Sequence, residues 1–155
     1  MRIHRALIAG ATLGGVGAVC AWPFFHATVD PTYQLMIPFS GVAALVSGGI
    51  LWLLVVPAHS HVGALRPFVV GAATGFLAHP FAWYLLIIFN FLRGTPGSLG
   101  EAPLGPVDGL KGALVLSLWS WFLAGWLTIP VGGLVGLVLR RVVANAGGSR
   151  ENGRA

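Results

Sequence analysis

The chain has 155 residues, of which 56% are hydrophobic and only 8% are charged, whereas about 25% of the residues in an average soluble domain are charged. Nine basic and four acidic residues give a net charge of +5, and the mean hydropathy is +0.84. So few charges cannot cover a soluble protein of this size, and one cysteine cannot form an internal disulfide. The composition therefore argues against a soluble enzyme, a nucleic-acid-binding protein and a disulfide-stabilised secreted domain.

Four segments without Asp, Glu, Lys or Arg predict four transmembrane helices. They are residues 6–29, 31–65, 67–92 and 112–139. A hydrocarbon core of about 30 Å is crossed by about 20 helical residues, so each segment holds one helix, and the continuous apolar runs favour helices over barrel strands. We place the helices near 7–25, 35–56, 67–92 and 113–139. The prediction is an all-α, integral membrane four-helix bundle in a single domain (1–145), followed by a Gly-rich, disordered cytoplasmic tail (146–155).

The first helix follows Met-Arg-Ile-His-Arg, which resembles the start of a signal peptide. However, the apolar segment continues as far as Phe25, and no clean small-x-small cleavage site precedes Trp22. We therefore expect an uncleaved helix.

Glycines at helical spacing predict where the helices touch. Membrane helices gain little by hiding Leu from lipid, and they associate where small residues let two backbones approach closely. Gly-x-x-x-Gly spacings and a related glycine on the first helix mark such faces. The predicted packing residues are Gly10, Gly14, Gly17, Gly71, Gly75, Gly132 and Gly136.

His79 lies at the centre of segment 67–92, and Pro80 follows it. An ionisable group near the bilayer midplane is a candidate functional residue. Asn90 and Arg93 lie on nearly the same helix face, so the three residues form a candidate intramembrane polar site. The alternative is structural: a neutral His79 that bonds a hydroxyl such as Ser47 or Thr128 and fastens the bundle.

No cofactor, metal site or catalytic group is predicted. Haem held by His79 and His26 is not expected, because the two side chains differ in depth by roughly half the bilayer. His59-Ser-His61 lacks the third and fourth ligands of a stable zinc site. No predicted helix contains Asp or Glu, and no catalytic serine motif occurs, so we do not expect an enzyme.

The last helix carries aromatic residues opposite its small ones. Trp119, Phe122 and Trp126 point away from the face of Ser117, Ser120 and Thr128, toward lipid or a partner. The connection before this helix, residues 94–111, is rich in Gly and Pro and is expected to be an irregular external loop.

The basic residues predict the topology. Seven of the nine lie on the side of the N-terminus, the second connection and the C-terminus: Arg2, Arg5, Arg66, Arg140, Arg141, Arg150 and Arg154. The positive-inside rule therefore predicts a multi-pass protein of the cell (plasma or inner) membrane with both termini cytoplasmic. The basic residues are explained by the membrane topology and by contact with anionic lipid, so they do not indicate a nucleic-acid partner.

Two functions fit this pattern. The first is a small interaction or assembly subunit that packs within or against a larger membrane complex, with self-association or other membrane proteins as partners. The second is an oligomeric transporter or channel that conducts a small solute or proton along the polar face around His79. The scarcity of polar groups and the glycine faces favour the first.

Overall fold

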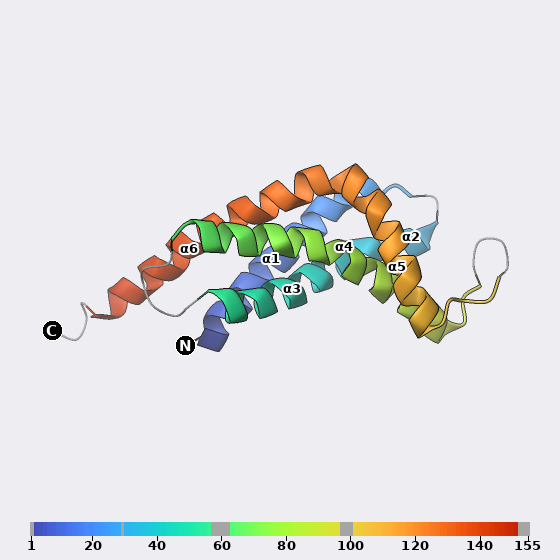
Figure 1. The fold of residues 1–155 in the computed structure, drawn as a ribbon, viewed down its shortest axis with the longest axis horizontal. Coiled ribbons are helices and arrows are strands. Elements are labelled where there is room, and N and C mark those ends of the chain that lie inside the picture. Colours follow the sequence, from blue (N-terminus) through green and yellow to red (C-terminus); the bar gives the residue numbers. More distant parts are fainter. Residues whose placement is uncertain (1, 29, 57–62, 97–100, 152–155) are drawn as a thin grey trace.

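The computed structural model describes residues 2–28, 30–56, 63–96 and 101–151, and it is a helical bundle without a strand in those ranges (Figure 1). The elements in chain order are α1 (Arg2–Phe25), α2 (Pro31–Gln34), α3 (Met36–Val55), α4 (Leu65–Arg93), α5 (Pro106–Ser120), the π-helical turn η1 (Trp121–Gly125) and α6 (Trp126–Glu151). The all-α fold predicted from the sequence is confirmed.

Within the described ranges, four helical segments are long and apolar enough to cross a membrane. They are Ile3–Phe25, Pro31–Val55, Leu65–Arg93 and Pro106–Val142. The start of α1 and the end of α6 lie at the same end of the bundle, as an even number of crossings requires (Figure 1). The four-helix membrane bundle is therefore confirmed, while the cytoplasmic location of the termini remains a prediction.

Two boundaries differ from those expected. Gly94 takes the left-handed conformation that ends α4, with a φ of 62°, and α5 already begins at Pro106 because proline suits the first helical turn. Residues 106–111 are thus helical rather than part of the loop. Likewise α6 continues to Glu151, so the predicted tail begins within a helix. His59, His61 and residues 152–155 lie outside the described residues.

Glycine brings α1 against α3 along most of their length. A Cβ atom added to Gly10 would lie 2.7 Å from the Leu45 carbonyl oxygen, and one on Gly14 would lie 2.9 Å from the Gly41 carbonyl oxygen. A Cβ on Gly17 would meet the Ala44 side chain at 2.9 Å. Real Cβ atoms do not approach other atoms so closely, so the two helices can pack this closely only because these residues are glycines, which have no side chain.

The contact between α4 and α6 is closer still. A Cβ atom on Gly71 or on Gly132 would collide with the backbone of the other, and one on Gly136 would collide with the Pro67 carbonyl. On Gly75 it would lie 2.5 Å from the Thr128 carbonyl oxygen. All seven glycines singled out in the sequence therefore lie in one of two backbone contacts, α1 with α3 or α4 with α6.

The fourth span is bent. No loop separates α5, η1 and α6, yet α5 runs in a different direction from α6 and crosses the end of α4 (Figure 1). The bend falls at the π-helical turn, a common cause of helix kinks. We call the half of the bundle with the start of α1 and the end of α6 the terminal half, and the half with α2, the end of α4 and the start of α5 the loop half. Only the loop half contains α5.

Each half has its own buried cluster. Ala9, Leu13, Trp52, Val70 and Leu139 are among the buried residues of the terminal half. In the loop half the buried cluster consists of Met36, Ala43, Ala82 and Leu86.

Candidate functional site

His79 lies midway along α4 and bonds two hydroxyl groups of the bent span. Its Nδ1 atom is within hydrogen-bonding distance of Ser120 Oγ, and its Nε2 atom is 2.9 Å from Thr128 Oγ1. Of the two partners considered from the sequence, Thr128 is therefore in contact. The other, Ser47, donates instead to the Ala43 carbonyl at 2.6 Å.

The hydrogen-bond network assigns the His79 tautomer. The Thr128 hydroxyl donates to the Ala124 carbonyl at 3.2 Å, so it has no second hydrogen to give to the imidazole. His79 Nε2–H is therefore the donor to Thr128, and Nδ1 accepts the Ser120 hydroxyl hydrogen. A neutral imidazole with both nitrogens satisfied can be held inside a membrane at little cost.

Pro80 creates a second link between α4 and the bend. Proline has no N–H group, so the Phe76 carbonyl one turn earlier loses its helical donor. The indole Nε1–H of Trp121 donates to that carbonyl at 3.0 Å. The Phe76 and Trp121 rings also stack, with centroids 4.1 Å apart and planes 11° from parallel. The carbonyl freed by proline thus becomes an anchor for η1.

This anchor could not be predicted from the sequence. A proline in a helix leaves a carbonyl without its donor, and an indole in an apolar span needs a hydrogen-bond acceptor. The two signals lie 45 residues apart, and only the tertiary fold pairs them.

Side chains within the bend also donate hydrogen bonds to its backbone carbonyls. Trp126 Nε1 donates to the Leu123 carbonyl at 2.8 Å, and Thr128 donates to the Ala124 carbonyl. Pro130 also lies in the first turns of α6, where it cannot donate to a preceding carbonyl. The bend is therefore built into the local sequence as well as fastened to α4.

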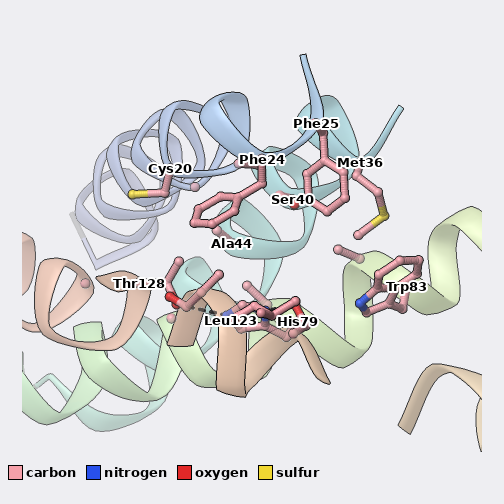
Figure 2. Close-up of a pocket in the computed structure, with 18 of the residues that line it drawn as sticks. Cys20, Phe24, Phe25, Met36, Ser40, Ala44, His79, Trp83, Leu123 and Thr128 are labelled. Atoms are coloured by element: carbon pink, nitrogen blue, oxygen red, sulfur yellow. Dashed lines mark hydrogen bonds between the residues drawn. The ribbon is translucent and has the colours of Figure 1, made fainter. Parts of the chain in front are cut away.

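A cavity of about 320 Å³ lies beside His79, mainly in the loop half. Leu13 of the terminal-half cluster and Gly132 line its near end. Figure 2 shows Phe24, Phe25 and Ser40 on one side of it, with His79, Leu123 and Thr128 on the other. Its lining comes from six elements, namely α1, α3, α4, α5, η1 and α6. Among the described residues that line it, none is Asp, Glu, Lys or Arg, so the cavity is mainly apolar.

Asn90 and Arg93 do not line this cavity. Arg93 lies at the end of α4, with its guanidinium carbon 5.1 Å from the centre of the Phe89 ring. The Asn90 carbonyl accepts the Thr95 N–H at 3.0 Å. The candidate polar site predicted from the sequence is therefore not gathered around one space.

His26 is also separate from His79. It follows the end of α1, where its Nδ1 atom is 2.8 Å from the Trp22 carbonyl oxygen. Its ring stacks on that of Trp22, with centroids 5.7 Å apart. His26 is exposed and does not line the cavity.

The aromatic face of the bend points outward. Trp119, Phe122 and Trp126 expose 68%, 78% and 69% of their surfaces. The apolar spans of the described residues define the class of the chain, a multi-pass helical membrane protein. A comparison with protein families, with curated proteins and with solved structures finds no match for the chain.

Proposed function

We propose that this protein is a small membrane subunit that packs against another membrane protein, or a second copy of itself, through the outward face of its bent span. The face consists of Trp119, Phe122 and Trp126. The depth of these side chains carries the proposal. Phe122 and Trp126 lie between Ser120 and Thr128, the two residues that bond the mid-span His79.

Aromatic side chains at this depth are too deep to belong to the belt of Trp and Tyr residues found at membrane interfaces. Trp that anchors a protein in a bilayer sits at the headgroup level, where its ring is in apolar surroundings and its N–H is hydrated. Large aromatic rings are enriched in protein interfaces, where they contribute much of the binding energy. An exposed cluster near the middle of the hydrocarbon is therefore better explained by a protein partner than by lipid alone.

The transport alternative has one observation in its favour, the cavity beside His79. Its lining lacks the charged groups that mark ion pathways in membranes, and Asn90 and Arg93 lie elsewhere. Both imidazole nitrogens are already hydrogen-bonded. The packing role therefore has the stronger support.

The test compares intact masses after gentle extraction from the membrane. The single chain is 16.2 kDa, and we expect native mass spectrometry to show a heavier complex. The double variant Phe122→Ala, Trp126→Ala should release the chain as a monomer. The matched control is Leu54→Ala, Leu92→Ala, which truncates two equally exposed apolar side chains on α3 and α4 and should keep the complex.

Circular dichroism of each variant shows whether its helices are retained. A parent protein that is monomeric under all gentle conditions would contradict the proposal. So would a complex that survives in the Phe122, Trp126 variant.

A further inference from the structure

Two polar groups on opposite sides of the cavity lack partners. The Trp83 indole nitrogen is buried and has no hydrogen-bond partner in the described part of the chain. In Figure 2 it lies on the edge of the ring that faces the other lining residues. Ser40, on α3, also lines the cavity, and its hydroxyl takes part in none of the hydrogen bonds among the described residues.

An unpaired indole N–H in apolar surroundings is destabilising, and native proteins usually supply an acceptor. Trp83 packs edge-on against Phe25 and Tyr33, with ring centroids 6.4 Å and 6.3 Å away. These contacts hold the indole in place but offer its N–H no acceptor. A bound molecule with an acceptor atom would satisfy it.

The cavity is open on the side that faces the bilayer. Its walls include Phe24 of α1 and Trp119 and Leu123 of the bend, all of them exposed at the surface. In the described ranges α1 packs mainly on α3 and makes almost no contact with α5. Entry from the hydrocarbon would therefore be on the side between α1 and α5, and Phe122 and Trp126 of the proposed docking face do not line the cavity.

We infer that this cavity binds an uncharged, ring-shaped apolar molecule with a carbonyl acceptor, the chemistry of a membrane quinone, taken up sideways from the bilayer. The absence of charged lining residues excludes an ionic ligand. Trp83 can only donate, so the ligand must accept a hydrogen bond. Phe24, Phe25, Trp83 and Trp119 give the site aromatic walls suited to a flat ring.

The depth of Trp83 argues against the ester group of an ordinary phospholipid. Trp83 follows the mid-span His79 by four residues, about one helical turn. Its N–H therefore lies within the hydrocarbon, whereas phospholipid esters lie at the interface. A quinone dissolves in the hydrocarbon, so its carbonyl groups can reach the depth of the Trp83 N–H.

The experiment uses two probes that differ only in their acceptors. Duroquinone is a tetramethylated ring with two carbonyls, and its full substitution avoids addition of the Cys20 thiol. Durene has the same four methyl groups and no oxygen. Binding is measured from the rise of the unfolding temperature of the full chain with probe concentration, followed by circular dichroism.

For the parent protein we expect both probes to stabilise, and duroquinone to bind about fivefold more tightly because of one added hydrogen bond. Trp83→Phe keeps the ring and removes the N–H, so duroquinone should bind like durene. Retained binding of durene shows that the cavity of this variant is intact. Trp22→Phe, an exposed indole outside the cavity, should behave like the parent.

Ala78→Leu places a larger side chain in the lining and should abolish the response to both probes. Equal affinity of the two probes for the parent would overturn the inference, as would no stabilisation by either. Full preference for duroquinone in Trp83→Phe, or undiminished binding in Ala78→Leu, would also overturn it.

Discussion

In the terminal half of the bundle the backbones of α4 and α6 touch at Gly71 with Gly132 and at Pro67 with Gly136. Beyond Gly132, which lines the near end of a cavity of about 320 Å³, the same span bends and the cavity opens in the loop half. Both halves are apolar, so hydrophobicity does not distinguish them. The two halves differ in their local sequence. The terminal half has small residues where α4 meets α6, whereas the loop half begins at Pro80 and the π-helical turn. The comparison shows that one span can supply both a rigid contact and an open pocket.

The largest effect is expected in the terminal half. Gly71→Ala adds a Cβ atom that would collide with the Gly132 backbone, which cannot move aside as a side chain can. Overpacking of this kind costs about 3 kcal/mol or more in severe cases. We expect a large fall in the unfolding temperature in detergent.

The matched control is Gly15→Ala on α1, where no atom lies within 4 Å of the added Cβ. Alanine is favoured over glycine in helices by about 0.5–1 kcal/mol, so this variant should be as stable as the parent or slightly more stable. Equal destabilisation by both substitutions would mean that the α4–α6 contact is looser than described.

That these glycines lie on packing faces could be predicted from their spacing, because residues four apart share a helix face. The spans were also predictable, since length and the absence of charge define them. Which helices pair could not be predicted, because each glycine face is compatible with several partners. The same limit applied to His79, for which Ser47 and Thr128 were equally acceptable by depth.

The bend and the cavity could not be predicted for a different reason. Segment 112–139 is uniformly apolar, and the spacing of its apolar residues does not reveal the π-helical turn at Trp121–Gly125. The turn is stabilised by Trp121 acting on the Phe76 carbonyl of a different helix. Such a contact leaves no trace in local spacing.

A double-mutant cycle tests this anchor in the loop half. Trp121→Phe keeps the stacked ring and removes the donor, so the Phe76 carbonyl is left without a partner at a cost of about 1–2 kcal/mol. Pro80→Ala restores a backbone N–H that can bond that carbonyl. In the Pro80→Ala background we therefore expect Trp121→Phe to cost much less.

Coupling between the two positions is the quantity to measure, by unfolding of the parent, both single variants and the double variant. If the costs of the two substitutions simply add, the indole does not replace the missing helical donor, and the account of the bend is wrong.

A smaller effect is expected at His79. Side-chain hydrogen bonds within membranes contribute about 0.6 kcal/mol each on average, so His79→Ala should lose roughly 1 kcal/mol through its two bonds. His79→Asn and His79→Gln should retain part of the bonding and lose less.

These variants also separate the two functions. An imidazole titrates near neutral pH and an amide does not. A transporter that depends on His79 would lose pH-dependent flux in liposomes in the amide variants without losing stability. We expect instead that the parent shows no such flux.

The difference between the two halves is tested most directly by one pair of substitutions on a single helix. Gly75 and Ala78 are neighbours on α4 and both line the cavity. A Cβ on Gly75 would lie 2.5 Å from the Thr128 carbonyl oxygen, whereas a larger side chain at Ala78 can extend into the cavity. We predict that Gly75→Leu lowers the unfolding temperature strongly and that Ala78→Leu leaves it nearly unchanged. Equal losses in the two variants would contradict a close backbone contact between α4 and α6 beside an open cavity.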